Sequence, residues 1–431
     1  MKKNTRREFV KKSSSTILGT SLGFNMVKAN PYKRSLNSET LKVGLIGCGG
    51  RGTGAALQAT RSEDNVMLTA MSDIFPDKLA TSLKNLKIEN PTKIMVDADH
   101  QFIGFDSYKK VLDSDVDVVI LSTPPSFRPG HLRAAIEAGK HVFCEKPVAV
   151  DAPGIRSVIE TAKLAKEKGL SLMSGFCWRH DIPKIDTYNR ILDGEIGNVN
   201  TVYNTYNTGA LWFRDRKPEW SDFEYTMRNW LYYNWLSGDH IAEQAIHSLD
   251  MMSWIMGDEL PTSAVGTGGR QSRIDDKYGN VYDHFSIIYE YGDGRRGFHI
   301  SRQQEDCSRA YTVDAMGDQG HAHVDVFRKH NIIGKSGEWN WEGEKSNMYQ
   351  NEHNTLFAGI RNGDIFNDGE SAAHSTLLAI WGRMVAYTGK TITWDEALNS
   401  QEILGPKLED YSWDLDWPMK EVAMPGKTSF V

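Results

Sequence analysis

Short apolar runs without alternating polar positions recur through the first 175 or so residues. Four of them, 41–47, 66–71, 116–122 and 141–144, consist mainly of apolar residues, as expected of strands buried on both faces. Helical patterns lie between them, such as 133–138, which Gly139 ends. This alternation predicts an α/β domain with a parallel sheet. The helix 154–168 and the strand 171–173 are predicted to complete this first domain, 41–174.

A different pattern begins near residue 175, with aromatic segments and longer alternating strands. Residues 284–291, the turn 292–294 and residues 297–301 predict an antiparallel hairpin. Segments 310–315 and 322–326 are expected to add strands to it. The second domain, 175–431, is therefore predicted to be α+β with an open, largely antiparallel sheet. An open sheet face is often covered by another subunit, so we expect a homo-oligomer, a dimer or tetramer.

Composition excludes several classes of protein. The formal net charge is −6, and no basic stripe is present that would follow nucleic-acid phosphates, so we expect no nucleic-acid partner. The four cysteines show no CxxC spacing and are interpreted as small buried hydrophobic residues.

The N-terminus resembles an export signal. Residues 5–11, TRREFVK, resemble the twin-arginine motif, and a mildly apolar run and the small-residue site Val27-Lys28-Ala29 follow. We interpret 1–30 as a signal peptide and 31–40 as a linker, which predicts a periplasmic protein exported in the folded state. The run is too short and polar to span a bilayer, so no stable membrane insertion is expected. The alternative is a basic tail on a cytoplasmic protein.

The first chemical motif is the glycine-rich segment GCGGRG, 47–52, which directly follows a predicted strand. Gly47, Gly49, Gly50 and Gly52 give the GxGxxG spacing that lets the backbone approach a pyrophosphate at a helix N-terminus. Asp73 ends the second strand at the distance expected of the residue that binds the ribose hydroxyls, which favours NAD over NADP. Arg51 either reaches a phosphate or is exposed. The alternative is a glycine-rich turn without a ligand.

The second motif comprises Thr123-Pro124-Pro125, His131 and the segment AGKHVFCEKP, 138–147. With these motifs, the chain from about Leu41 onward resembles the Gfo/Idh/MocA family of NAD(P)-dependent sugar and cyclitol oxidoreductases. The resemblance implies a Rossmann domain, cofactor contacts from Ser122, Thr123, Pro124, His131 and Glu145, and a place for Lys146 beside the nicotinamide and the reacting carbinol. Arg128 departs from the family, where many members have a histidine.

Lys146 has two interpretations. A lysine near the cofactor's positive charge and away from water would have a lowered pKa and could accept a proton. Alternatively, Lys146 is a strand-end lysine that forms an ion pair with Glu145.

The third motif is GDHIAEQAIHSLD, 238–250. On one continuous helix, Glu243 and His247 would lie four residues apart on one face, with His240 before them and Asp250 after them. The family segment is roughly GxxxDxGxHxxD, with its Asp and His at the substrate, so here Glu243 replaces the Asp, whereas His247 and Asp250 match. His240, Glu243 and His247 also raise a metal alternative, although their spacing is not that of zinc hydrolases; we expect no metal.

Aromatic and basic residues cluster around these motifs. Trp178 and Arg179 are expected at the nicotinamide edge. A carbohydrate site is typically lined by aromatic faces and by hydrogen-bonding groups. We assign His180, Arg228, Tyr232, Trp235, His240 and Asp250 to the substrate side, with Trp212, Trp230 and Tyr233 in the same cluster.

Together these features predict an exported, NAD-dependent oxidoreductase that transfers hydride between a sugar or glycoside carbinol and nicotinamide. His247, assisted by Lys146 and Glu243, would handle the hydroxyl proton. Because free NAD is scarce outside the cytoplasm, we expect tight binding and recycling on the enzyme. Three alternatives stay open: an NAD-dependent glycosidase, whose members resemble CEV where this chain has CEKP; a non-catalytic sugar-binding protein that retains NAD; and a metal-dependent lyase or hydrolase.

Overall fold

The first domain is built on a parallel sheet. The computed structural model describes residues 39–431, so the predicted signal peptide and nearly all of the linker lie outside the described residues. The sheet has six strands in the order β3-β2-β1-β4-β5-β6, all parallel. They are β1 (Leu41–Ile46), β2 (Val66–Asp73), β3 (Gln101–Ile103), β4 (Val118–Leu121), β5 (His141–Cys144) and β6 (Leu172–Ser174). The strand order reverses between β1 and β4, which is where such sheets bind ligands.

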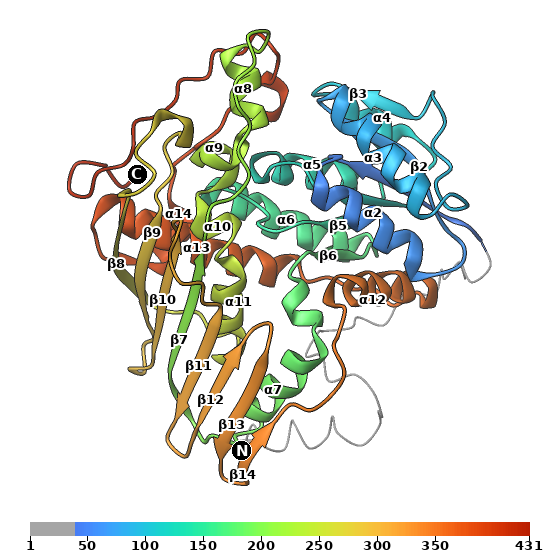
Figure 1. The fold of residues 1–431 in the computed structure, drawn as a ribbon. Coiled ribbons are helices and arrows are strands. Elements are labelled where there is room, and N and C mark those ends of the chain that lie inside the picture. The colour runs from blue at the N-terminus through green and yellow to red at the C-terminus, as the bar shows by residue number, and fades with distance from the viewer. Residues whose placement is uncertain (1–38) are drawn as a thin grey trace.

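Helices cover both faces of this sheet (Figure 1). They are α2 (Gly50–Ser62), α3 (Pro76–Glu89), α4 (Ser107–Asp113), α5 (Arg128–Glu137) and α6 (Ala152–Glu167). Helix α5 begins at Arg128, before the predicted helical segment 133–138. Pro129 lies in its first turn, where a proline is tolerated. The predicted α/β architecture is confirmed.

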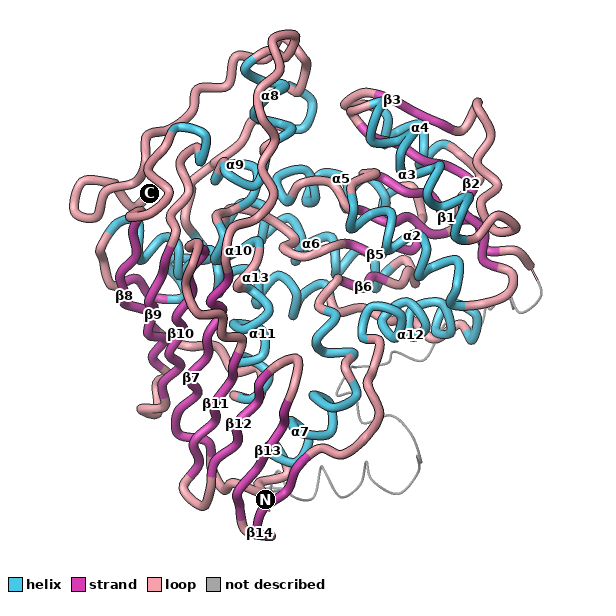
Figure 2. The backbone as a smooth tube through the Cα atoms, in the orientation of Figure 1, coloured by secondary structure: helices cyan, strands magenta, loops and turns pink. Residues whose placement is uncertain are grey.

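The second domain contains a nine-stranded sheet in the order β14-β13-β12-β11-β7-β10-β9-β8-β15. The strands are β7 (Val199–Thr208), β8 (Ser263–Gly269), β9 (His284–Glu290), β10 (Arg296–Gln303), β11 (Thr312–Gly317), β12 (His321–Asp325), β13 (Lys329–Gly334), β14 (Gly337–Asn340) and β15 (Ile392–Thr393). The predicted hairpin is β9–β10, and only β10 and β7 pair in parallel. The prediction of an open, largely antiparallel sheet is confirmed (Figure 2).

Two helices pack on one face of this sheet, α11 (Ile246–Ile255) and α13 (Gly369–Thr388). Every residue of α11 is buried, since α11 lies between the sheet and the rest of the molecule (Figure 1). The other helices of this part of the chain are α7 (Ile182–Leu192), α8 (Asp222–Arg228), α9 (Asn234–Ser237), α10 (His240–Glu243), α12 (Met348–Asn362) and α14 (Trp394–Asn399).

Helix α12 returns to the first domain, where it packs against α2. Its Leu356, Phe357 and Ile360 belong to the same apolar core as the strands of the parallel sheet. No pattern in the sequence of this segment predicts that placement. No helix within residues 39–431 is long and apolar enough to cross a membrane. Cys48, Cys144 and Cys177 are buried and free, as expected of small hydrophobic residues, whereas Cys307 is exposed.

Candidate active site

The glycine-rich loop joins β1 to α2 and leaves its backbone open. Gly47 has φ +98°, and a Cβ there would lie 2.7 Å from the backbone of Ser122 and Thr123. A Cβ on Gly52 would lie 2.0 Å from the carbonyl oxygen of Gly47. Around Gly49 and Gly50 there is open space instead. The loop therefore needs glycine for its close approaches and presents the N-terminus of α2 as a cradle for an anionic group.

Asp73, at the end of β2, faces this cradle. Its carboxylate accepts hydrogen bonds from the backbone N–H groups of Cys48 (2.7 Å) and Phe75 (2.9 Å). Burial raises the pKa of Asp73, and these two hydrogen bonds oppose that effect. The carboxylate is thus fixed between the loop and the start of α3, as the ribose-binding acid of a dinucleotide site requires.

A cavity of about 550 Å³ extends along the loop and between the two domains. Ten of the predicted cofactor residues line it: Gly47, Gly49, Gly50, Arg51, Gly52, Asp73, Ser122, Thr123, Pro124 and His131. Ser122 Oγ and His131 Nε2 are buried and have no hydrogen-bond partner within the described part of the chain. Unpartnered buried polar atoms of this kind fit a bound polar ligand. The cradle, Asp73 and these atoms together fit NAD.

Arg51 lines the cavity, but its guanidinium group is held by neighbouring side chains. Its Nε lies 2.8 Å from Glu145 Oε1, and its guanidinium stacks 4.7 Å from the Tyr349 ring centre. Arg51 therefore links the glycine loop to the segment that carries Lys146. Glu145 is the acidic partner of Arg51, and Lys146 Nζ pairs with Glu243 instead, so the alternative of a Lys146–Glu145 ion pair is wrong.

Lys146 contacts the second domain. Its Nζ donates a hydrogen bond to the backbone carbonyl of Glu243 at 2.5 Å and lies 3.6 Å from Glu243 Oε1. The two side chains are only 14% and 13% exposed, so their charges interact with little screening by water. Glu243 Oε2 is buried without a partner among the residues described, and Glu243 also lines the cavity. Lys146 itself does not line the cavity and is connected to it through Glu243.

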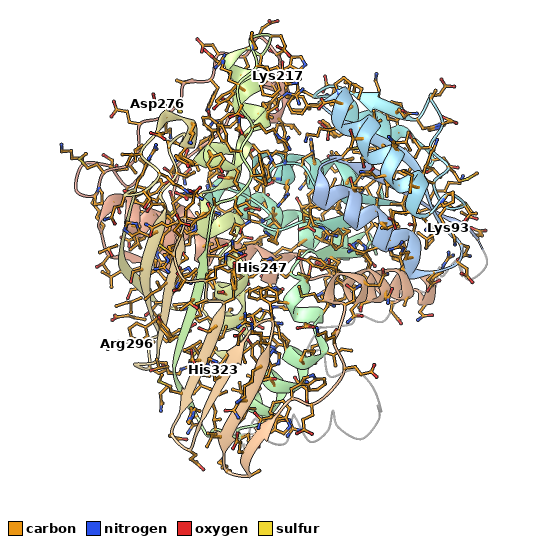
Figure 3. All side chains as sticks on the ribbon, viewed as in Figure 1. Lys93, Lys217, His247, Asp276, Arg296 and His323 are labelled. Carbon is orange, nitrogen blue, oxygen red and sulfur yellow. The ribbon has the colours of Figure 1, made fainter. Side chains whose placement is uncertain are left out.

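His247 lies beside this pair, near the centre of the molecule (Figure 3). Burial, with the positive charges of Lys146 and Lys184, holds the pKa of His247 well below its ordinary value. Its ring stacks on Trp178, with centroids 4.9 Å apart and 22° between the planes. His247 Nδ1 has no partner within residues 39–431. A neutral imidazole with a free nitrogen can accept a proton.

Aromatic rings continue outward from Trp178. The ring centroids of Trp178 and Phe327 are 5.9 Å apart, and those of Phe327 and Tyr311 are 5.5 Å apart. Tyr206 packs at 4.9 Å from Tyr311. Phe327 is 60% exposed although large and apolar, which gives this aromatic group a face open to a sugar ring. Of these residues, only Trp178 was predicted from the sequence to belong to the site.

The prediction of one continuous helix through 240–250 was wrong. Helix α10 ends at Glu243 and α11 begins at Ile246. The break separates His240 from the other residues, and its ring packs 5.0 Å from Phe285 of β9. Within residues 39–431, no group of three or more His, Cys, Asp or Glu side chains is arranged to hold a metal ion.

Arg179 and Asp250 contact each other instead of the cavity. Arg179 Nη2 lies 2.9 Å from Asp250 Oδ1 and 2.7 Å from Asp258 Oδ1. Asp250 also accepts a hydrogen bond from Ser375 Oγ at 2.7 Å. Neither Arg179 nor Asp250 lines the cavity. Their ion pair gives both side chains a structural role. His180 is likewise buried, with its ring 6.3 Å from Phe366.

The predicted substrate residues of the 228–235 segment differ in whether they line the cavity. Arg228 lines the cavity. The Tyr232 hydroxyl donates a hydrogen bond to the Trp212 carbonyl at 3.0 Å, so Tyr232 supports the loop that carries Trp212. Trp235 is buried and packs against Phe223 and Tyr411. Trp212 and Trp230 do line the cavity.

Several lining residues were missed: Ile74, Phe75, Lys78, Phe105, Tyr108, Phe127, Arg214 and Met227. Phe75 and Lys78 follow Asp73 so closely that the position of the ribose-binding acid was a sufficient indication. Arg128, the departure from the family, is buried and donates to the carbonyls of Thr123 (3.0 Å) and Pro147 (2.6 Å). It thereby ties the turn after β4 to the segment after β5.

Comparison with known proteins gives matches to two family models. Residues 41–176 match the model "Oxidoreductase family, NAD-binding Rossmann fold", and residues 187–323 match "GFO/IDH/MocA C-terminal domain". Together they match more than half of the chain.

Curated relatives are similar at low identity. The chain is 26% identical over 283 residues to an inositol 2-dehydrogenase of Rhizobium meliloti, covering 65% of this chain and 74% of that protein. It is also 26% identical over 235 residues to a glycosyl hydrolase family 109 protein of Solibacter usitatus, covering 53% and 52%. Among solved structures, aldose-aldose oxidoreductase from Caulobacter crescentus matches with a TM-score of 0.66 and 20% identity, covering 82% of this chain and 99% of that one. The last similarity shows a shared fold.

Proposed function

Because the chain belongs to the GFO/IDH/MocA oxidoreductase family and has its NAD-binding Rossmann domain, we propose that it is an NAD-dependent dehydrogenase acting on a sugar or glycoside. The observation that carries this proposal is the contact of Lys146 with Glu243, which lines the same cavity as the glycine cradle and Asp73. His247 lies near enough to Lys146 to be affected by its charge, although neither residue lines the cavity. The inositol dehydrogenase relative supports a polyhydroxylated substrate.

Each part of the site has a separate task in this proposal. The glycine loop would hold the pyrophosphate of NAD, Asp73 its ribose hydroxyls, and Ser122 and His131 further polar groups. Bound NAD supplies the hydride acceptor. The chain's own residues then orient the carbinol and remove its proton.

His247 is the proposed proton acceptor. Its low pKa keeps the imidazole neutral at neutral pH, so Nδ1, which has no partner in the described structure, can take the hydroxyl proton. Lys146, held by Glu243, would hydrogen-bond the same oxygen and stabilise the negative charge that develops as the proton leaves. The low exposure of Lys146 and Glu243 strengthens this effect because little water screens it.

We also propose export through the twin-arginine route and regeneration of NAD on the enzyme by a second sugar or another acceptor. The motif that supports export lies in residues 1–38, outside the described structure. Signal-peptide processing is tested by fractionating cells and sequencing the N-terminus of the protein recovered from each compartment.

A homo-oligomer, dimer or tetramer, is proposed from the more exposed face of the second sheet, as judged from residues 39–431. Tyr203, Phe298 and Ile288 form a row across β7, β10 and β9, since Phe298 is paired with both neighbours. The opposite face packs on α11, where a Cβ on Gly297 would lie 2.2 Å from Met252 Sδ. Light scattering of the wild type and of Phe298→Glu tests the interface: a lower mass for the variant supports it.

A glycosidase that works by transient oxidation is the second candidate, and the Solibacter relative is the observation in its favour. In that reaction, oxidation of one carbinol acidifies a neighbouring C–H, and the glycosidic bond then breaks by elimination. Retention of Lys146 favours net oxidation, because members of the family with the oxidative glycosidase activity resemble CEV where this chain has CEKP.

A panel of sugars, inositols and aryl glycosides separates the two candidates. Stoichiometric keto-sugar and reduced cofactor support the dehydrogenase. Release of free aglycone without net reduced cofactor or keto-sugar would refute it and support the glycosidase. NAD released on denaturing the purified protein, measured by mass and absorbance, tests cofactor retention separately.

A further inference from the structure

The cavity is closed on one side by residues of the second domain. Trp212, Arg214, Met227, Arg228 and Trp230 line it opposite the first-domain residues Asp73, Phe75 and Lys78. They belong to the loop after β7, to α8 and to the turn that follows it. Figure 1 shows α8 beside the end of the first domain that carries β3 and α4. Because Asp73 marks the ribose position, these residues face the adenosine half of the site.

Arg228 joins this segment to the first domain. Its Nη1 and Nη2 donate to the Asp77 carboxylate at 3.2 and 3.1 Å, and its guanidinium lies 4.0 Å from the Phe75 ring centre. Its Nε also donates to Glu224 within α8 at 2.8 Å. One side chain thus holds α8 against the start of α3.

The C-terminal segment makes a second connection, through aromatic rings. Trp413 packs 4.9 Å from Phe105 and 5.5 Å from Phe75. Tyr411 packs 4.4 Å from Phe127. Phe75, Phe105 and Phe127 all line the cavity from the first domain. The C-terminal segment therefore covers the outer side of the residues that form the adenosine end.

Positive charge gathers at the same end. Burial lowers the pKa of Lys78, and the charges of Arg214 and Arg228 lower it further, against the raising effect of Asp77 and Asp73. The Arg214 guanidinium lies 5.2 Å from the Trp212 ring centre. Asp77 is engaged by Arg228, so Lys78 and Arg214 remain as cationic groups that can donate hydrogen bonds to the ribose and base of an adenosine.

We propose that these second-domain segments form an adenosine subsite that encloses and retains NAD. Trp212 and Trp230 supply aromatic surface for the adenosine, and Lys78 and Arg214 supply hydrogen-bond donors for its ribose and base. NAD leaves this subsite only when the contacts of Arg228, Tyr411 and Trp413 with the first domain separate. The inference rests on the NAD site of the proposed function, and it explains how cofactor would stay bound through successive turnovers.

Exchange of bound NAD for fluorescent etheno-NAD, in the absence of any sugar, tests the subsite. Trp413→Ala and Arg214→Ala are compared with Trp417→Ala and Arg216→Ala. Trp417 packs on Trp235 at 6.1 Å within the second domain, and Arg216 forms its ion pair with Asp222; neither lines the cavity. Arg214→Gln, which removes the charge and keeps a polar side chain, is a milder second variant.

We expect Trp413→Ala and both Arg214 variants to exchange NAD about tenfold faster than the wild type, since each loses one aromatic or charged contact. The two controls should exchange at the wild-type rate. Wild-type exchange in both Trp413→Ala and Arg214→Ala would overturn the subsite, as would equal acceleration by Trp417→Ala. Because no sugar is present, these results are independent of whether the proposed dehydrogenase reaction occurs.

Discussion

Replacing Lys146 by Met tests the proposed chemistry most directly. The substitution removes the ammonium group that lies 3.6 Å from Glu243 Oε1, and it keeps an unbranched side chain of similar length. A positioned acid–base group contributes about 10²- to 10⁴-fold to the rate, which corresponds to about 3–5 kcal/mol of transition-state stabilisation. We place Lys146→Met in this range because the pair is only slightly exposed.

The assay is a single turnover on enzyme loaded with NAD. A sugar oxidised by the wild type is mixed with each variant, and reduced nicotinamide is followed by its absorbance. We expect the rate constant to fall about 10²- to 10⁴-fold with a small change in the sugar concentration at half-maximal rate. NAD content, measured after denaturation, should equal that of the wild type, since Lys146 does not line the cradle.

Lys93→Met is the matched control. Lys93 lies on the first domain far from His247 (Figure 3), and its Nζ contacts the Glu63 carbonyl at 3.4 Å. It should react at the wild-type rate. An unchanged rate in Lys146→Met would refute the proton-handling role. If the wild type binds NAD and sugar but oxidises no sugar, a non-catalytic binding protein is the better explanation.

Three further substitutions test other parts of the structure. Asp73→Ala removes the ribose-binding carboxylate, so NAD should bind about 10- to 100-fold more weakly by fluorescence titration, with a smaller loss for NADP. Asp250→Asn breaks a buried ion pair and should lower the free energy of unfolding by about 3–5 kcal/mol in urea, with little effect on the sugar concentration at half-maximal rate. Burial and the charge of Arg128 lower the pKa of His131 from 6.5 to about 3. As the pH falls from 6.5 toward 3, this histidine takes up a proton in the unfolded chain but not in the folded protein, so the free energy of unfolding falls by on the order of a few kcal/mol. His131→Asn should therefore flatten the loss of stability in acid, measured by urea unfolding between pH 7 and 4.

Each of these has a control and a contradicting result. Asp99→Asn, an exposed carboxylate, should leave NAD affinity unchanged, and equal NAD affinity in Asp73→Ala would exclude its ribose role. Asp258→Asn removes the more exposed partner of Arg179 and should cost about 1 kcal/mol or less. His321→Asn, on the surface of β12, should keep the wild-type acid slope. The same slope in His131→Asn would mean that other groups govern acid unfolding.

The fold could be predicted from the sequence where local patterns determine it. Every residue of strand β1 except Lys42 is buried, so its apolar run was sufficient, and the glycine spacing identified the loop. Helical spacing could not predict the break between α10 and α11, because the residues on both sides of the break form helix and are largely apolar. The packing of α12 on the first domain depends on contacts between residues distant in sequence, such as Phe357 with that domain's core.

The site was predictable in its cofactor half and less so on the substrate side. Cofactor residues follow directly from the ends of strands, which is why Asp73 and Thr123 line the cavity as expected. On the substrate side, residue type alone could not distinguish a ligand contact from an internal partner. Asp250 matched the family motif, yet its carboxylate is used by Arg179 and Ser375.

The segment from Glu145 to Pro147 shows how the two halves of the site are connected. Glu145 contacts Arg51 of the glycine loop, Lys146 contacts Glu243 of α10, and the Pro147 carbonyl accepts from Arg128, which also holds the turn at Thr123. Three adjacent residues therefore join the cofactor cradle, the turn after β4 and the substrate domain. A lysine placed in this way has its position fixed by both domains. In the proposed mechanism, its ammonium group would act on the substrate oxygen only when the glycine loop and α10 are both in place.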